Sequence, residues 1–432
     1  MATQNMTDAP AKPRPPVALR WAILVFISIA MFGNYYIYDA LSPVAKLLKD
    51  QLGFSDSNIG WLQGIYSLVN VVMVLIGGII IDRIGTRIST FVFAFLCLIG
   101  AAITVVTDSF AVMLIGRLVF GLGAESLIVA ITTALAKWFK GKELSFAFGI
   151  NLLIARLGSF LALNSPSWAS AFYDSWRWPL MLGVGAGVVC IVGALIYWVL
   201  ESRAREKYSL GAAGETDRVE WKQIFSFSKS YWLVVALCVT FYSGAFPFQT
   251  FAIKFFEEAH GTTAQVGGFL SSLLTLFAMI FTPIFGLMAD RFGRRSLFMF
   301  MGSILLIPVY LMVAYLDISL FIPMAMMGIS FSVIPAVMWP SVAYIVDEKK
   351  LGTAFGLMTM IQNIGMFAFN ILIGWANDFS KAGPENPGGY ALGMWLFTGL
   401  GFLGLLFSFL LWRQERGPNA HGLETITTKT ST

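Results

Sequence analysis

A ten-residue pattern occurs twice in this chain. It reads Gly78-Ile79-Ile80-Ile81-Asp82-Arg83-Ile84-Gly85-Thr86-Arg87 and, 208 residues later, Gly286-Leu287-Met288-Ala289-Asp290-Arg291-Phe292-Gly293-Arg294-Arg295. A second repeat has nearly the same offset, since Ala147-Phe148-Gly149 and Ala354-Phe355-Gly356 each open an apolar run. Two matches in register indicate a duplicated unit, which is typical of membrane transporters.

The composition points the same way. The chain has 432 residues, of which 57% are apolar and 12% charged, about half the charged fraction of a typical soluble protein. The mean hydropathy is +0.75. These values exclude a soluble globular enzyme, a disordered chain and a nucleic-acid-binding protein. Cys97, Cys190 and Cys238 lie in apolar runs and are interpreted as small hydrophobic residues; with only two His, neither metal nor cofactor is expected.

Twelve apolar runs are long enough to cross a bilayer, which takes about 20 residues. They cover residues 21–43, 59–81, 88–107, 110–136, 144–166, 178–200, 230–254, 264–289, 296–315, 319–346, 352–376 and 390–412. The predicted fold is therefore an all-α membrane protein with twelve transmembrane helices in two pseudo-symmetric bundles of six.

The connections define the predicted domains. The one long polar segment, 201–229, separates a first bundle at 21–200 from a second at 230–412. Residues 1–20 and 413–432 are predicted to be cytosolic tails, and the first of these lacks the apolar core of a signal peptide.

The distribution of Lys and Arg predicts the orientation. With the N-terminus inside, inner loops and tails hold 22 of the 29 basic residues, and the outer loops hold five. The inner set includes Lys12, Arg14, Arg20, Arg83, Arg87, Lys137, Lys140, Lys142, Arg291, Arg294, Arg295, Lys349 and Lys350; the outer set is Lys46, Lys49, Arg177, Lys254 and Lys381. Both termini are therefore expected in the cytosol.

The repeated pattern, G-x-x-x-D-R-x-G-x-R, resembles the signature of the major facilitator superfamily. Further segments are similar to the lysosomal dipeptide uniporter branch of that superfamily: Gly116–Leu127, Trp138–Leu144, Ala155–Ser159, Trp339–Val346, Leu351–Gly356 and Gln362-Asn363. The resemblance implies a carrier that works by alternating access. It also implies that the two patterns form an inner latch between bundles, built from Gly78, Asp82, Arg83, Gly85, Arg87, Gly286, Asp290, Arg291, Gly293 and Arg294.

Ionisable residues inside spans are costly and are candidates for function. Glu125 in the fourth span and Arg156 in the fifth each lie 11 residues from the inner ends of their runs, about 16 Å deep at 1.5 Å per residue. One interpretation is a structural ion pair between them. The other is a site for a zwitterion such as a dipeptide, and the resemblance implies that Glu125 binds its amino end and Arg156 its carboxyl end.

Further residues are assigned from their place in the spans. Asp39 and Arg117, nearer the outer surface, are predicted to form a polar contact with each other. Polar and aromatic residues expected in the cavity wall are Asn34, Tyr35, Tyr38, Tyr66, Asn70, Tyr242, Gln249, Trp339, Gln362 and Asn363.

Two other functions stay open. A proton-coupled carrier of amino acids, sugar acids or other small organic anions would use Glu125 or Asp39 as its proton site, because neither His lies in a span. A membrane receptor or assembly subunit without transport is the second. An enzyme is not expected, since the spans contain no nucleophile–His arrangement.

Location and partners are inferred from what the tails contain. The tail has no acidic dileucine signal, and the Asn5-Met6-Thr7 triplet would be cytosolic. We therefore expect a bacterial inner membrane, with a lysosomal membrane as the alternative. The expected state is a monomer that binds a small molecule and lipid, and the accessory glycoprotein that the resemblance implies is not expected.

Overall fold

The structure is a computed structural model that describes residues 13, 15–139, 143–210 and 226–427. Several features of the sequence interpretation fall outside the described residues: the triplet at 5–7, the basic residues Lys12, Arg14, Lys140 and Lys142, and more than half of the 201–229 connection.

Within the described residues, twelve helical segments are long and apolar enough to cross a membrane, which confirms the predicted fold class. The first six arise from α1 (Val17–Asp39), η1 (Ser42–Val44), α2 (Ala45–Leu52), α3 (Asp56–Ile84), α4 (Thr86–Val106), α5 (Phe110–Phe139), α6 (Leu144–Leu163), α7 (Ser165–Trp168), η2 (Ser170–Phe172) and α8 (Arg177–Lys207). The second six arise from α9 (Lys229–His260), α10 (Ala264–Phe292), α11 (Arg295–Tyr315), α12 (Phe321–Val333), η4 (Ile334–Met338), α13 (Trp339–Ile345), η5 (Glu348–Lys350), α14 (Leu351–Phe379), η6 (Pro387–Tyr390) and α15 (Ala391–Gln414).

Local sequence explains where several helices begin and end. The side chains of Ser55, Ser228 and Thr263 accept a hydrogen bond from the backbone N–H three residues later, which caps α3, α9 and α10. Gly53 and Gly261 follow α2 and α9 in the left-handed conformation that suits glycine.

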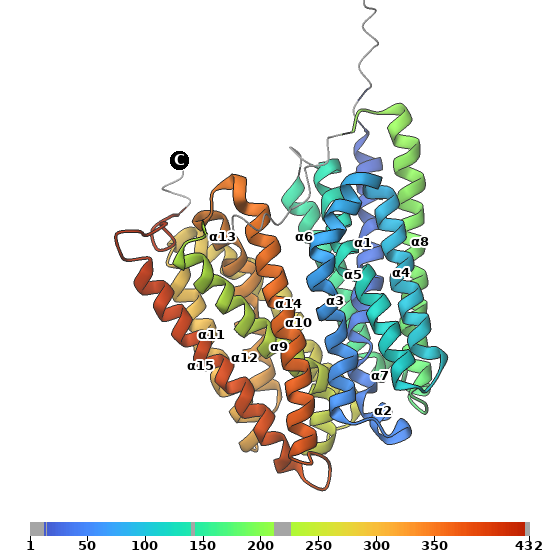
Figure 1. Cartoon of the computed structure of the whole chain (residues 1–432), viewed down its shortest axis with the longest axis vertical. Helices are drawn as coiled ribbons and strands as arrows, with labels where there is room; N and C mark the ends of the chain where they lie inside the picture. The colour runs from blue at the N-terminus through green and yellow to red at the C-terminus, as the bar shows by residue number, and fades with distance from the viewer. Residues whose placement is uncertain (1–12, 14, 140–142, 211–225, 428–432) are drawn as a thin grey trace, which may run out of the picture.

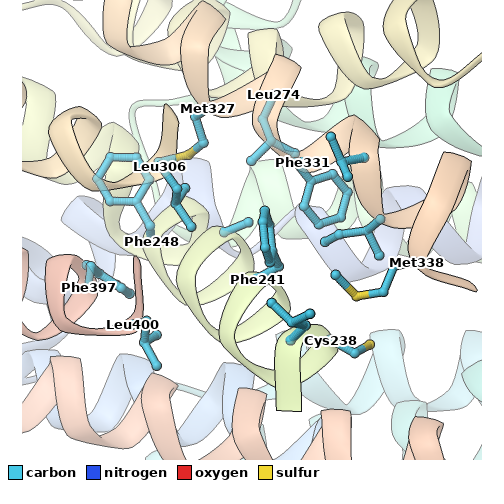
Figure 2. Packing of buried hydrophobic residues seen from close by; sticks show 14 of the residues in the cluster. Cys238, Phe241, Phe248, Leu274, Leu306, Met327, Phe331, Met338, Phe397 and Leu400 are labelled. Atoms are coloured by element: carbon cyan, nitrogen blue, oxygen red, sulfur yellow. The ribbon is translucent and has the colours of Figure 1, made fainter. Parts of the chain in front are cut away.

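The helices form two bundles, one built from α1–α8 and the other from α9–α15 (Figure 1). The bundles diverge toward the face that carries the α3–α4 and α10–α11 turns, which we call the motif face, and converge toward the opposite face. In the second bundle, α9 runs through the middle of the apolar core (Figure 2). Its side chains, such as Phe241 and Phe248, lie in one cluster with residues of α10, α11, α12 and α15, among them Leu274, Leu306, Met327, Phe331 and Phe397.

The bundles contact each other closely where α3 meets α14. A Cβ atom on Gly60 would lie 2.3 Å from the carbonyl oxygen of Asn370, and one on Gly374 would lie 2.4 Å from that of Asp56. Gly60 and Gly64 are spaced as the small residues of tightly packed membrane helices are. The two backbones therefore touch with no side chain between them.

The two repeated patterns make equivalent tight turns. Gly85 ends α3 with φ at +81° and Gly293 ends α10 with φ at +65°. These dihedral angles are costly for any residue with a Cβ. The second glycine of each repeat, Gly85 and Gly293, is thus explained by the backbone conformation alone.

Replacing Gly85 by Ala should destabilise the protein by about 1–3 kcal/mol, because the turn holds a backbone conformation that L residues rarely adopt. The matched control is Gly149→Ala, inside α6, where an added Cβ has no neighbour within 4 Å. That control should be neutral or slightly stabilising. The melting temperatures of the two purified variants test this, and equal values for both would contradict the assignment.

Candidate functional site

A cavity of ≈ 190 Å³ lies between the two bundles. The first bundle contributes Asp39, Glu125 and Arg156, with three tyrosines; the second contributes aromatic and amide side chains. Its lining includes most of the candidates named from sequence: Asn34, Tyr35, Tyr38, Tyr66, Tyr242, Trp339, Gln362 and Asn363. The cavity thus brings together residues that are more than 300 positions apart.

Glu125 and Arg156 face the same cavity but do not neutralise each other. Among the described residues, no ion pair joins Glu125 to Arg156. The interpretation of the two residues as a structural ion pair therefore has no contact to support it. The Glu125 carboxylate accepts a hydrogen bond from the Tyr66 hydroxyl at 3.5 Å. The Arg156 guanidinium carbon lies 5.6 Å from the centre of the Tyr35 ring. Each of the two side chains thus contacts a tyrosine, and both line the cavity.

Helix geometry sets their depth. Glu125 lies 14 residues before the end of α5, and Arg156 lies 12 residues after the start of α6. At 1.5 Å per residue they are about 21 Å and about 18 Å from the motif-face ends of their helices. Opposite charges therefore occupy similar heights in the middle of the first bundle.

The aromatic walls come from both bundles. Tyr38 packs on Tyr66, with ring centres 4.9 Å apart, and meets Phe246 of the second bundle at 6.3 Å. Trp339 stacks on Phe355 at 5.8 Å. Trp339 follows η4, a π-helical turn that interrupts span ten; such turns are frequent at functional sites.

Two candidates from the sequence lie outside the cavity wall. Asn70 is buried and donates to Asn363 Oδ1 at 3.4 Å, so it supports a lining residue. Gln249 donates to the Ser271 carbonyl at 3.2 Å, within the second bundle. Conversely, the sequence interpretation missed several lining residues whose apolar or small side chains give no signal of their own: Ile128, Ser159, Phe246, Thr359 and Met366.

The polar contact predicted between Asp39 and Arg117 stays a prediction, because the hydrogen bonds of Arg117 go to other groups. Arg117 donates to the carbonyl oxygens of Ile37 at 3.1 Å and Leu62 at 3.2 Å, and to Gln63 Oε1 at 2.7 Å. No hydrogen bond or ion pair joins it to Asp39 in the described part of the chain. The last carbonyl oxygens of α1 have no hydrogen-bond donor within that helix. The Arg117 guanidinium supplies the missing donors at Ile37 and Tyr38. Asp39 lines the cavity instead.

The cavity continues toward the motif face. A second cavity, of ≈ 740 Å³, shares Glu125, Trp339 and Thr359 with the first and extends to Gly78 and Gly356. Gly78 is in the last turns of α3, and Gly356 is near the start of α14. The central site is therefore open to the motif face.

The repeated pattern lies along this open face. Arg87 donates to Ser202 of α8 at 2.9 Å, and Arg295 pairs with Asp290 at 3.3 Å, both within one bundle. The other members are placed in or beside the same turns: Asp82, Arg83 and Gly85 at the end of α3, and Gly286, Arg291, Gly293 and Arg294 at the end of α10. A latch between the bundles remains a prediction.

A buried charge network closes the opposite face. Lys254 of α9 has a fully buried side chain, and its Nζ lies 2.6 and 2.7 Å from the carboxylate oxygens of Asp56 in α3. Lys254 also donates to the Tyr390 hydroxyl at 3.0 Å, and Tyr390 donates to Glu258 at 2.5 Å. Asp378 of α14 accepts hydrogen bonds from the backbone N–H groups of Asp56 and Ser57, each at 2.8 Å.

This network corrects one assignment from the sequence. Lys254 was expected in an outer loop, but α9 continues to His260 and encloses it. Its partner is 198 residues away in the chain, so no local pattern identifies the pair. One local signal was present in the sequence. Lys254, Glu257 and Glu258 follow an apolar run at the spacing of one helical turn, which indicates that the helix continues past Lys254.

Removing one partner of the network should be strongly destabilising. Lys254→Met leaves a buried carboxylate without its cation, a change that typically costs about 3–5 kcal/mol. The matched control is Lys46→Met, whose partner Asp50 is exposed. Removing an exposed ion pair costs at most about 1 kcal/mol.

Melting temperatures of Lys254→Met, Asp56→Asn and the double variant provide the test. The double variant should lose less than the sum of the single variants, because the second change removes the charge left unpaired by the first. Additive losses would mean that the two side chains do not act as a pair.

The chain is similar in sequence and in structure to known membrane transporters. The sequence family described as Major Facilitator Superfamily matches twice, over residues 27–257 and 233–428. The chain is 32% identical to the lysosomal dipeptide transporter of Bos taurus over 376 residues, covering 84% of this chain and 80% of that protein. It is 26% identical to a galacturonate transporter of Dickeya chrysanthemi over 193 residues, which cover 44% of this chain and 55% of that protein. The structure of the nucleoside transporter NupG aligns with a TM-score of 0.73 and 14% identity, covering 90% of this chain and 99% of that one.

Proposed function

The chain belongs to the Major Facilitator Superfamily and is a multi-pass membrane transporter rather than an enzyme, and from this premise we propose that it carries dipeptides by alternating access. In this proposal Glu125 binds the amino end of the peptide and Arg156 the carboxyl end. Transport is uniport, driven by the dipeptide gradient alone.

The observation that carries the proposal is a pair of opposite charges, unpaired with each other, in one cavity between the bundles. A free dipeptide is a zwitterion whose charged ends are separated by a chain of about 3.5 Å per residue. A guanidinium suits a carboxylate because it can bind both oxygens. A dipeptide would therefore offer Glu125 and Arg156 each a partner of opposite charge.

The remaining lining suits variable side chains. Tyr242, Trp339 and Phe246 offer aromatic surface, and Gln362 and Asn363 offer amides that can donate or accept hydrogen bonds. The chain covers most of the length of the lysosomal dipeptide transporter that it resembles, which supports the same substrate class.

The distribution of charge supports an orientation with the motif face in the cytosol. Arg83, Arg87, Lys137, Arg291 and Arg294 all belong to helix ends or turns on that face. Basic residues are enriched on the cytosolic side of membrane proteins. We propose that both termini are cytosolic and that the host membrane is a bacterial inner membrane.

Glu125→Gln should reduce dipeptide affinity by about 30-fold or more, because it removes one partner of a buried charge interaction. Arg156→Lys should also weaken binding, because it keeps the positive charge but loses the planar fork that binds a carboxylate through two hydrogen bonds. Uptake of labelled dipeptides into proteoliposomes and dipeptide-induced thermal stabilisation measure this effect. Matched controls are Glu206→Gln and Arg177→Lys, which make the same changes at exposed positions outside the cavity. Full uptake by either site variant would disprove the assignment.

A second candidate is a proton-coupled carrier of a sugar acid or another small organic anion. It is favoured by the similarity to the galacturonate transporter and by Asp39, a second carboxylate in the cavity wall. Arg156 would bind the anion, and Asp39 or Glu125 would carry the proton.

Flux measurements with a pH-sensitive dye inside proteoliposomes separate the two candidates. Uniport of dipeptides should leave the internal pH unchanged, and Asp39→Asn should retain uptake in the absence of a pH gradient. Internal acidification that accompanies uptake of galacturonate, and that Asp39→Asn abolishes, would favour the proton-coupled carrier.

A further inference from the structure

A separate cavity of ≈ 460 Å³ lies outside the transport path, where α11 and α15 reach the motif face. It shares no lining residue with the two central cavities. Its position at the end of two neighbouring spans places it near one surface of the membrane.

One part of this cavity is apolar and faces away from the protein core. Leu297 of α11 is 39% exposed, Phe409 of α15 is 46% exposed, and Phe300 and Trp412 complete the wall. Along α15, Phe402 and Leu406 continue the exposed apolar surface toward the middle of the membrane. These side chains form a surface suited to an acyl chain.

The other part of the cavity is basic. Arg294 precedes α11 and Arg416 follows α15, and both are exposed. The Arg416 guanidinium carbon lies 4.2 Å from the centre of the Trp412 ring, which orients it. Among the described residues, no carboxylate lies within ion-pair distance of either guanidinium.

One acidic residue, Glu424, also lines the cavity, but its charge is already engaged. Its carboxylate accepts hydrogen bonds from the backbone N–H and hydroxyl of Ser296, at the positive N-terminus of α11. The backbone N–H of Arg294 donates to the Glu424 carbonyl at 3.1 Å. The segment after α15 thus fixes the turn that presents Arg294.

We propose that this cavity binds an anionic phospholipid of the cytosolic leaflet. The phosphate lies between Arg294 and Arg416, which can each bind two oxygens, and one acyl chain follows Leu297, Phe300 and Phe409. Basic pockets beside membrane helices on the cytosolic side bind acidic headgroups, and that leaflet carries the anionic lipids. The assignment to this leaflet rests on the proposed orientation; it is independent of the substrate.

The test uses the purified full-length protein and measures thermal stabilisation during titration with phosphatidylglycerol. The double variant Arg294→Asn, Arg416→Gln should bind this lipid about 25-fold more weakly, since each basic side chain near an anionic surface contributes about fivefold. Asn is chosen because it tolerates the left-handed backbone at position 294, where φ is +48°. The matched control is Arg413→Gln, an exposed arginine one turn earlier that does not line the cavity.

Three results would overturn the proposal. Weakening by Arg413→Gln as large as that by Arg294→Asn or Arg416→Gln alone would indicate attraction to surface charge in general. Equal stabilisation by phosphatidylcholine would remove the role of the acidic headgroup, and equal stabilisation by inorganic phosphate would indicate a soluble anion in place of a lipid. If the double variant fails to fold, native mass spectrometry of the single variants gives the same comparison through the number of phosphatidylglycerol molecules retained. A failure of dipeptide transport would leave these outcomes unchanged.

Discussion

The buried ion pair between Lys254 and Asp56 determines which side of the molecule is open. It joins α9 of one bundle to α3 of the other, and Asp378 adds hydrogen bonds to the N-terminus of α3 from the end of α14. With the opposite face held in this way, the bundles can separate only toward the motif face. The two connected cavities that reach Glu125 follow from that separation.

The buried charges differ in whether they have a partner of opposite charge. Lys254 and Asp56 on the opposite face are paired and buried, whereas Glu125 and Arg156 are not paired with each other and each contacts a tyrosine. Leaving charge uncompensated in a membrane protein is costly, and a ligand that supplies both opposite charges relieves that cost. The same reasoning favours a structural role for Arg117, because each of its three guanidinium nitrogens donates to a carbonyl or amide oxygen of α1 or α3.

The sequence predicted the fold well because its signals are local. Apolar runs, the repeated turn with Gly85 and Gly293, and the mid-span position of Glu125 and Arg156 can each be read from a short segment. The network around Lys254 could not be predicted, since its members lie on α3, α9, α14 and the α14–α15 connection. The missed wall residues, such as Phe246 and Ile128, have the same side chains as ordinary core residues. They differ only in that they face the cavity between the bundles.

The glycine contact between α3 and α14 has a consequence for how the bundles move. Interlocked side chains resist sliding, because each must leave its groove before a helix can turn. At Gly60 and Gly374 the surfaces are smooth backbone, so the helices can roll on one another with little steric resistance. This contact is therefore suited to act as a pivot. It can keep the two bundles at a constant distance while the cavity between them opens toward one face or the other.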